Sequence, residues 1–443
     1  MKPYPKYKET YFEWISRIPQ HWEAKRLKFL VKEKLSYGSN ELAESEDTSL
    51  PRYIRITDFD ENGELRNDTF KSLSFDLAKG YILSEGDILF ARSGATVGKT
   101  FQFKNYHGLA CYAGYLIKAS PDIKIILSDF LYYFTKSNNY ESWKNSTFIQ
   151  ATIQNISADK YSSLVIPLPN LDEQTLIIRF INENSFKIDS VISKKLKLIE
   201  LLNEERTAII NRAVSKGIDP NVKMKYSGIE WLGEIPEHWE IKPIKYNTYI
   251  KGRIGWQGLK QSEFTESGAY LITGMNFKDG VINWDEVYHI SDERYVEAPE
   301  IHLKVGDVLL TKDGTIGKLL FVDYLPDRTS LNSHLLLLRP LRNVYKSKFL
   351  YYLLHSNYFK TFIELTKVGT TFYGITQESM ERFPMVIPQS TEQELIIEKI
   401  EEETSKINKT ISKIKKEIEL LQEYQTALIS EAVTGKIDVR VEV

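Results

Sequence analysis

The stretch DEQTLIIRFINENSFKIDSVISKKLKLIELLNEERTAIINRAVS, residues 172–215, decides the architecture, and the chain uses it twice. It returns at residues 391–434 as TEQELIIEKIEEETSKINKTISKIKKEIELLQEYQTALISEAVT. Apolar residues at alternating steps of four and three form the a/d seam of a coiled coil. The predicted seam consists of Ile188, Ile192, Ile199, Leu202 and Ile209 in the first stretch and Ile407, Ile411, Ile414, Ile418, Leu421 and Leu428 in the second.

Polar residues interrupt this seam. Lys195 and Arg206 occupy two seam positions in the first stretch, and Gln425 corresponds to Arg206 in the second. Polar seam residues cost stability but discourage slipped pairings. Because two long helices with matching seams occur in one chain, we expect them to pack on each other as an antiparallel coiled coil.

Local signals mark both ends of each helix. Asp172 and Thr391 are the predicted N-caps, because each stands three residues after a proline and Thr391 opens a capping box. Gly217 and Gly435 follow the last apolar positions and are predicted to end the helices.

Shorter motifs repeat together with the helices. EWISRIPQHWEAKRLK at 13–28 returns as EWLGEIPEHWEIKPIK at 230–245, and GDILFARSGATVGK at 86–99 returns as GDVLLTKDGTIGK at 306–318. A nearly constant separation indicates two copies of one unit, each a globular segment followed by a long helix. The predicted division is residues 1–170, 171–217, 218–389 and 390–443.

Each globular segment is predicted to be α+β. Short apolar and aromatic runs are broken by Gly, Asp, Asn and Pro, a pattern that predicts strands and hairpins. FLYYFTKSNNYESW at 130–143 and FLYYLLHSNYFKTFI at 349–363 carry helical apolar spacing in corresponding places. A mostly antiparallel sheet with flanking helices follows from this mixture.

Composition sets broad limits. A chain of 443 residues is long enough for two to four domains, and its net charge of -2 gives no global indication of nucleic-acid binding. Cys111 is the single cysteine, so disulfides and cysteine-rich metal sites are excluded. No apolar segment is long enough to span a bilayer, and residues 1–10 lack a signal-peptide core. We predict a cytoplasmic protein.

The glycine-rich loop GATVGKT at 94–100 resembles a phosphate-binding loop but is one residue too short for GxxxxGK[ST]. Its counterpart GTIGKL at 314–319 places Leu319 where a magnesium-binding hydroxyl would stand. Both stretches are predicted to be β-hairpins. A nucleotide-dependent enzyme that uses this loop stays open as an alternative.

Other catalytic signals are missing from the sequence. His21 and His238 occupy the same place in the repeated IPxHW motif and are interpreted as packed rings beside Trp22 and Trp239. Metal ligation would need further ligands at suitable spacing, and the sequence shows none. We expect no catalytic residues, no metal and no cofactor in this chain.

Binding is better supported, because polar and basic residues recur beside aromatic ones in loop-like places. Arg and Lys pair with guanine edges, while Asn and Gln pair with adenine. Ordinary solvated loop residues are the alternative at each position. The candidate DNA-binding residues are Arg52, Arg55, Arg92, Ser93, Thr147 and Gln150 in the first copy and Lys251, Arg253, Lys312, Asn332, His334, Thr371 and Tyr373 in the second.

Taken together, the repeated plan resembles the specificity subunit of type I restriction-modification systems. The resemblance is carried by SGIEWLGEIPEHWE at 227–240, by both glycine-lysine hairpins, and by PxxxEQ at 169–174 and 388–393. It covers nearly the whole chain. The first copy departs from the family pattern at Tyr11–Trp14, where YFEW precedes Ile15.

The resemblance implies a non-catalytic subunit with two target-recognition domains, residues 1–170 and 218–389, each reading one half of a split double-stranded DNA target. It implies that the helices act as a spacer and dock two modification subunits, which methylate adenine with S-adenosylmethionine. Restriction subunits that use ATP and magnesium are the other implied partners. A helix of about 43 residues is roughly 65 Å long, enough to reach separate duplex turns of about 34 Å. A coiled-coil scaffold without DNA readout is the remaining alternative.

Overall fold

The computed structural model describes residues 2–60, 63–148, 155–253, 258–278, 280–313, 316–366 and 374–442. The chain divides into two compact units. Unit 1 comprises Met1–Lys195 with Lys415–Val443, and unit 2 comprises Leu196–Ile414. Each unit therefore combines one globular segment with parts of two long helices.

The two long helices are α5, Leu171–Lys216, and α10, Ser390–Val433. Each begins slightly before its predicted N-cap. At α5 the side-chain Oδ1 of Asn170 accepts from the backbone N–H of Glu173 at 2.9 Å, so Asn170 caps the helix in place of Asp172. An asparagine at this position satisfies a helix N–H as well as an aspartate does, which explains the shift.

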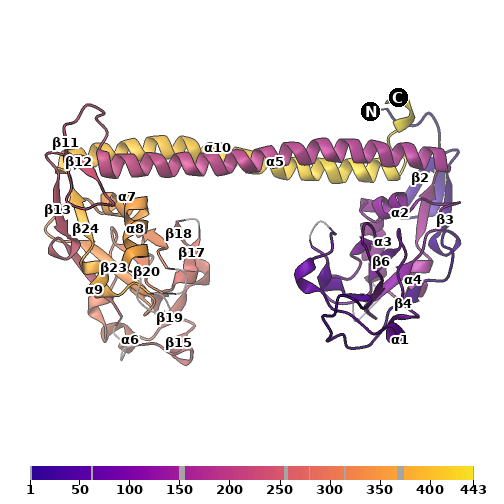
Figure 1. Ribbon diagram of the computed structural model, residues 1–443, viewed down its shortest axis with the longest axis horizontal. Helices are drawn as coiled ribbons and strands as arrows, with labels where there is room; N and C mark the ends of the chain where they lie inside the picture. Colours follow the sequence, from indigo (N-terminus) through magenta and orange to yellow (C-terminus); the bar gives the residue numbers. More distant parts are fainter. Residues whose placement is uncertain are drawn as a thin grey trace. The chain divides into compact units, whose positions relative to one another are not determined.

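Polar contacts show that α5 and α10 run antiparallel (Figure 1). In unit 1, Gln425 donates to Asp189 at 3.2 Å, and Lys195 pairs with Glu417 further along α5. As the residue number along α5 rises, the residue number of its bonding partner on α10 falls, as it does in an antiparallel pair. In unit 2, Arg206 donates to Asn408 at 3.0 Å. The predicted antiparallel coiled coil is confirmed, and the three polar seam residues Lys195, Arg206 and Gln425 each bond across the helix pair.

Burial follows the predicted seam. All the seam residues are buried or half-buried, whereas residues such as Lys409 and Thr410 on the outer face are exposed. The buried members are Ile188, Ile407, Ile411, Ile414, Ile418 and Leu428, and the half-buried members are Ile192, Ile199, Leu202, Ile209 and Leu421.

The globular segment of unit 1 contains one four-stranded sheet in the order β4-β9-β6-β7, and β5 pairs with β8 in parallel. Its short helices lie beside the sheet (Figure 1). The strands are β1 Tyr7–Phe12, β2 Ile15–Pro19, β3 Glu23–Arg26, β4 Ser36–Tyr37, β5 Arg52–Ile54, β6 Ile88–Ala91, β7 Thr100–Gln102, β8 Ala110–Tyr112, β9 Leu116–Ala119 and β10 Val165–Leu168. The helices are α1 Phe75–Ala78, α2 Ser128–Phe134, α3 Asn138–Phe148 and α4 Ala158–Ser162.

Unit 2 repeats this sheet as β14-β23-β20-β21, with the same antiparallel pairings, and adds β15-β19-β16-β22. The repeat predicted from sequence is therefore present in the strand order. The strands are β11 Met224–Tyr226, β12 Glu234–Pro236, β13 Glu240–Pro243, β14 Thr248–Gly252, β15 Phe264–Thr265, β16 Ala269–Ile272, β17 Phe277–Lys278, β18 Val281–Ile282, β19 Tyr288–Ile290, β20 Val308–Thr311, β21 Leu319–Phe321, β22 Thr329–Leu331, β23 Leu335–Pro340 and β24 Pro384–Ile387. The helices are α6 Asp292–Val296, α7 Ser347–His355, α8 Asn357–Thr366 and α9 Gln377–Glu381.

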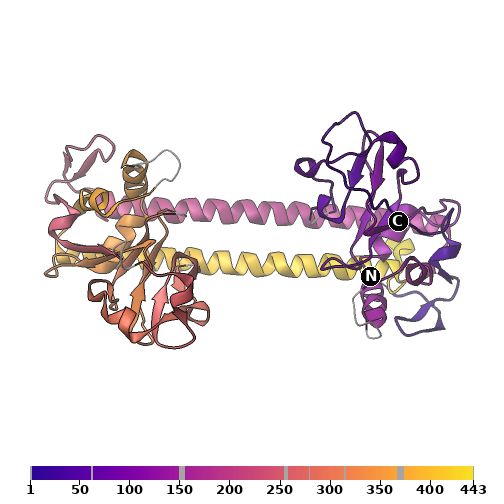
Figure 2. The same cartoon turned by 90° about the horizontal axis from the view of Figure 1, so that it is seen from below.

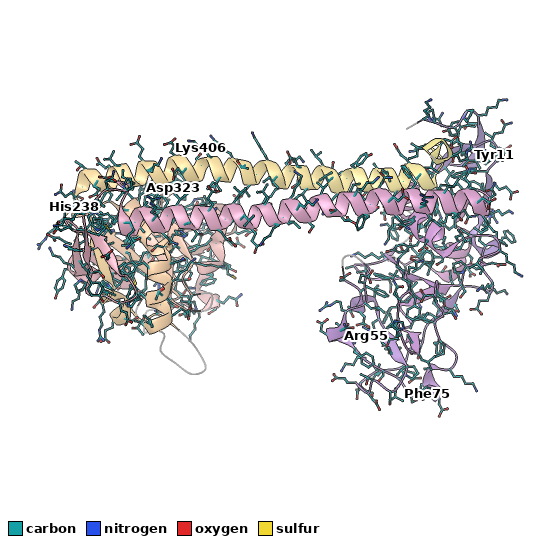
Figure 3. The ribbon with its side chains drawn as sticks, turned by 45° about the horizontal axis from the view of Figure 1, so that its top comes forward. Tyr11, Arg55, Phe75, His238, Asp323 and Lys406 are labelled. Carbon is teal, nitrogen blue, oxygen red and sulfur yellow. The ribbon has the colours of Figure 1, made fainter. Side chains whose placement is uncertain are left out.

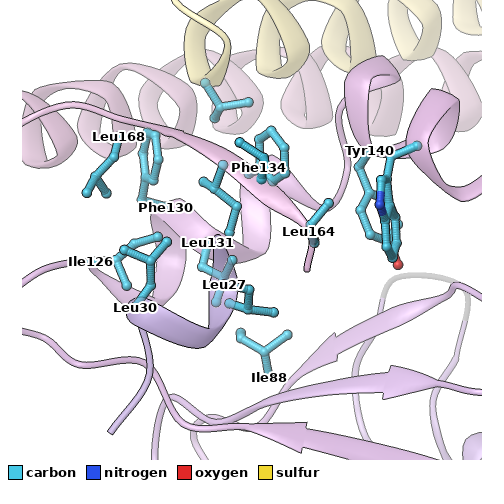
Figure 4. Packing of buried hydrophobic residues seen from close by; sticks show 14 of the residues in the cluster. Leu27, Leu30, Ile88, Ile126, Phe130, Leu131, Phe134, Tyr140, Leu164 and Leu168 are labelled. Atoms are coloured by element: carbon cyan, nitrogen blue, oxygen red, sulfur yellow. The ribbon is translucent and has the colours of Figure 1, made fainter. Parts of the chain in front are cut away.

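The central strands of the sheets β4-β9-β6-β7 and β14-β23-β20-β21 are buried on both faces, which explains their continuous apolar runs in sequence. In β6, Ile88 and Phe90 belong to the core that α2 covers, whereas Leu89 and Ala91 belong to a second core. Figure 4 shows the first core, where Phe130 and Phe134 of α2 lie among leucines from neighbouring segments. That core continues into the long helices, because residues of both α5 and α10 belong to it.

The predicted helices at 130–143 and 349–363 are each broken in two. In unit 1, α2 ends before Ser137 and α3 begins at Asn138, and in unit 2 α7 and α8 are separated at Ser356. Ser356 has extended backbone angles, φ -76° and ψ 161°. A serine followed by asparagine favours a new helix start over a continuing helix, so the apolar spacing alone was misleading here.

The repeated IPxHW and PxxxEQ motifs bind each other. His21 Nε2 lies 2.9 Å from Glu173 Oε2 in unit 1, and His238 Nε2 lies 2.7 Å from Glu392 Oε2 in unit 2. Figure 3 shows His238 beside the start of α10. The motif histidines therefore hold the first turn of a long helix.

In unit 1 residues near the two ends of the chain lie close together (Figure 2). The backbone N–H of Asp438 donates to the carbonyl of Lys2 at 2.8 Å, and Tyr4 Oη donates to Glu173 at 2.7 Å. In unit 2 the corresponding place is crossed by the continuous chain from Gly217 to β11.

Replacing Ile411 with alanine tests the helix pair. Ile411 is 8% exposed, and the truncation leaves a cavity in the seam, so we expect the free energy of unfolding to fall by about 2–4 kcal/mol. Urea unfolding followed by circular dichroism measures the change. Lys409→Ala on the exposed face is the control, and equal midpoints for the two variants would contradict a packed seam.

Candidate nucleic-acid interface

Among the candidate residues of unit 1, Arg92 stands at one end of the four-stranded sheet. Ala91, the last residue of β6, pairs with Leu116, the first of β9, so Arg92 leaves the sheet at this end. The Arg92 guanidinium lies 4.9 Å from the ring centre of Tyr37, and its Nη1 donates to the Gly114 carbonyl at 3.5 Å. A half-buried arginine is thus held against an aromatic ring.

The same end of the sheet in unit 2 gathers five of the candidates. Thr311, the last residue of β20, pairs with Leu335, the first of β23, and Gly252 ends β14 beside them. Lys312 follows β20, and its Nζ lies 3.8 Å from the position that a Cβ on Gly252 would take. The candidates that meet here are Lys251, Arg253, Lys312, Asn332 and His334.

Identical backbone hydrogen bonds build these two sheet ends. The N–H of Arg92 donates to the Tyr115 carbonyl at 3.1 Å, and the Arg92 carbonyl accepts from Ile156 at 2.9 Å. In unit 2 the N–H of Lys312 donates to the His334 carbonyl at 3.0 Å, and its carbonyl accepts from Ile375 at 2.7 Å. Arg92 therefore corresponds to Lys312, and Tyr115 corresponds to His334.

Tyr37 and Tyr115 were missed by sequence reasoning. Tyr37, whose ring lies against the Arg92 guanidinium, is 41% exposed, and Tyr115, whose carbonyl accepts from the Arg92 N–H, is 68% exposed. For Tyr115 the available signal was its place between Gly114 and the apolar run LIKA, and no comparable signal marks Tyr37. Exposed rings beside a cation suit stacking as well as polar contacts.

Charge at the unit 2 sheet end is mixed. His334 Nδ1 lies 2.5 Å from Asp313 Oδ1, and both side chains are exposed. Arg253 is 3% exposed; its Nε donates to the Leu331 carbonyl at 3.0 Å and its Nη2 to Ser330 Oγ at 3.1 Å. Burial, with Arg294 nearby, lowers the pKa of Arg253. Arg253 thus supports the sheet end from within.

The remaining candidates of unit 1 lie elsewhere or are engaged in the fold. Arg52 is 2% exposed between Phe70 and Tyr106 and donates to the Arg66 carbonyl. The other placements are as follows: Arg55 binds Asp58 through Nε at 3.2 Å and Nη2 at 2.8 Å, Ser93 forms a bridge with Asn155, and Thr147 lies on α3 with its hydroxyl donating to the Lys144 carbonyl.

Arg55 lies in the part of the unit 1 globular segment away from α5 (Figure 3). Gln150, Thr371 and Tyr373 lie outside the described residues.

The glycine-rich loop is a hairpin between β6 and β7, as predicted. Val97 donates to the Gly94 carbonyl at 3.0 Å, Gly98 to Ala91 at 2.9 Å and Lys99 to Thr96 at 2.9 Å. A phosphate-binding loop needs successive N–H groups that point at the phosphate, and here these three are used within the hairpin. The structure therefore gives no support to the alternative that this loop binds a nucleotide.

Within the ranges that the structure describes, no cluster of His, Cys, Asp and Glu is arranged to hold a metal ion. Among the same residues, no helix has both the length and the apolar character needed to cross a membrane.

Residues 19–201 and 254–420 match the model of the type I restriction modification DNA specificity domain. The chain belongs to this family. Its role is therefore in DNA-target specificity, and proteins of this kind are not themselves catalytic.

Relatives support this over the full length. The chain is 26% identical to the type I restriction enzyme MjaVIII specificity subunit of Methanocaldococcus jannaschii, over 98% of this chain and 97% of that protein. It is 25% identical to the putative MjaX specificity subunit of the same organism, over 98% of each.

Solved structures share the fold. A chain from structural work on complex assembly and conformational transition of the type I R-M system matches with a TM-score of 0.64 and 16% identity, over 95% of this chain and 99% of that one. The HsdS subunit of Thermoanaerobacter tengcongensis matches with a TM-score of 0.52 and 16% identity, over 97% and 100%.

The two basic residues that flank Gly252 should behave differently when their charge is removed. Arg253→Met leaves buried acceptors without their charged donor. We therefore expect the free energy of unfolding to fall by about 1.5–3 kcal/mol. Lys251→Met changes a half-buried side chain and should leave stability within about 0.5 kcal/mol. Thermal unfolding of both variants measures this, and equal losses would contradict the supporting role of Arg253.

Proposed function

We propose that each globular segment reads one half of a bipartite double-stranded DNA target through the sheet end described above. In the first half the readers are Arg92, Tyr37 and Tyr115. In the second half they are Lys312, Asn332 and His334. Arginine and lysine recognise guanine edges, and asparagine recognises adenine.

The observation that carries this proposal is a shared framework with different side chains. The same backbone bonds hold Arg92 and Lys312, yet arginine faces tyrosine in one half and lysine faces glycine in the other. Two equivalent surfaces with different chemistry suit two different half-sites. A scaffold without DNA readout would have no reason to place cations and exposed rings at the same end of both sheets.

We further propose that α5 and α10 set the number of base pairs between the half-sites and dock two modification subunits. These partners would supply S-adenosylmethionine for adenine methylation. Restriction subunits would supply ATP-dependent translocation and magnesium-dependent cleavage. This chain would contribute recognition and no catalytic residue, and its location in the cytoplasm remains a prediction.

The direct test is to express the chain with its modification subunits and map methylated adenines across a genome by single-molecule sequencing. We expect a split motif with a fixed gap. Exchanging residues 11–169 for the corresponding segment of another family member should change one side of the motif only. Methylation that does not depend on this chain, or a motif without a gap, would refute the proposal.

Alanine at Arg92 and at Lys312 should affect different half-sites. Each substitution removes one direct base contact, so discrimination should fall by about 5- to 150-fold at one position of one half-site. Methylation rates on duplexes with single base changes measure this. Arg66→Ala and Lys304→Ala change exposed cations away from the sheet ends and are the controls. Equal weakening on every sequence would identify phosphate contacts instead.

Removing one heptad from both α5 and α10 should shorten the gap in the methylated motif. Seven residues correspond to roughly 10 Å of helix, or about three base pairs. Deleting whole heptads retains the seam, so folding should survive. Motif mapping of the shortened chain provides the measurement, and an unchanged gap would show that the helices do not set it.

A further inference from the structure

Two fully buried glutamines tie the globular segments to the long helices. Gln174 Oε1 accepts from the backbone N–H of Leu127 at 2.8 Å, and its Nε2 donates to the carbonyls of Ile125 and Pro169, each at 3.0 Å. Leu127 is the residue that precedes α2. One side chain on the first turn of α5 therefore fixes the beginning of α2.

Unit 2 repeats this contact. Gln393 Oε1 accepts from the backbone N–H of Lys346 at 2.8 Å, and its Nε2 donates to the Pro388 carbonyl at 2.8 Å. Lys346 precedes α7 as Leu127 precedes α2. Both glutamines are 0% exposed. The glutamine that ends each PxxxEQ motif thus bonds a long helix to the residue before a short helix.

A second contact lies just beyond the end of each of these short helices, where the next helix begins, and it comes from the other long helix. The backbone N–H of Asn138, where α3 begins, donates to Ser430 Oγ of α10 at 3.1 Å. The backbone N–H of Asn357, where α8 begins, donates to Asn211 Oδ1 of α5 at 2.6 Å. In each unit the segment that contains the short helix is thereby pinned at two points, just before the helix starts and just after it ends, once to each long helix.

The pinned helix also holds the sheet. Gln102 at the end of β7 donates to Ser128 Oγ at 3.0 Å and to Asp129 Oδ1 at 2.9 Å at the start of α2. In unit 2, Phe321 of β21 packs against Tyr351 of α7 with ring centres 6.0 Å apart. The pinned helix therefore links the sheet that carries the proposed reading end to the two long helices.

We propose that Gln174, Gln393, Asn211 and Ser430 are positioning residues that make the protein reject targets with a wrong spacer length. One added base pair displaces a half-site by roughly 3.4 Å and rotates it by roughly 34°. Productive geometry tolerates about 10–20°, so a segment that is pinned at two points cannot follow that rotation. A segment released at one point can follow it.

This inference rests on the proposed bipartite function. The experiment uses the chain assembled with its modification subunits and three duplexes, one with the native gap and two with the gap one base pair shorter or longer. Gln393→Met retains length and shape but removes the amide. We expect the ratio of methylation rates on native and altered gaps to fall by about tenfold or more, equivalent to about 1.4 kcal/mol.

Asn211→Ala provides the second variant, because Asn211 is partly exposed and its loss is less disruptive to folding. Asn203→Ala is its matched control, since among the described residues the Asn203 amide donates to the Ile199 carbonyl of its own helix and holds no short helix. Gln422→Met, at an exposed position of α10, is the control for Gln393→Met. Both controls should retain the native ratio.

The outcomes separate the two proposals. A lower ratio in Gln393→Met and Asn211→Ala, with the controls unchanged, supports positioning. Variants that lose stability or overall rate but retain the native ratio overturn it, because a purely structural role lowers all three rates equally. If the unaltered chain methylates no gapped target, the proposed function fails first.

Discussion

The structure depends on a buried junction between one motif and the ends of two helices. In unit 1, Glu173 is 3% exposed, and a carboxylate buried this deeply requires hydrogen-bonding partners. His21 and Tyr4 provide them. The neighbouring Trp22 packs against Gly435 just beyond the end of α10, where a Cβ would lie 3.2 Å from the indole. One motif thereby joins the start of one long helix to the end of the other, which fixes how their seams align.

The two junctions solve the same problem with different bonds. In unit 2 Trp239 Nε1 donates to Glu392 at 3.0 Å, and Gly217 lies beside the same indole. In unit 1 Trp22 Nε1 is buried without a partner among the described residues, and Tyr4 donates to the glutamate instead. A covalent connection completes one junction, whereas hydrogen bonds between residues near the two ends of the chain complete the other. The repeated glycine, tryptophan and glutamate are what both junctions retain.

Sequence reasoning succeeded where periodicity or duplication carried the information. The coiled coil, the repeated strands and the hairpin after Ala91 follow from residue spacing that occurs in both copies of the repeat. It failed where a tertiary partner decides the outcome. Arg253 and Arg52 look like surface cations in sequence, yet backbone carbonyls from distant segments allow both to be buried. The break before Asn138 has a local signal in the Ser-Asn pair, but the residue that accepts from the Asn138 N–H, Ser430, lies almost three hundred residues away.

Backbone bonding explains how one framework can carry two chemistries. The N–H and carbonyl groups that hold Arg92 and Lys312 belong to the main chain, so a change of side chain leaves them intact. Strands that are buried on both faces supply the stability, and the exposed or half-buried side chains just beyond the strand ends, unlike the buried Arg253, contribute little to it. Selection can then alter those residues without loss of the fold. The glutamine and asparagine pins are different, because their bonds are made by side chains, so substitution there changes the geometry in which every reading residue is presented.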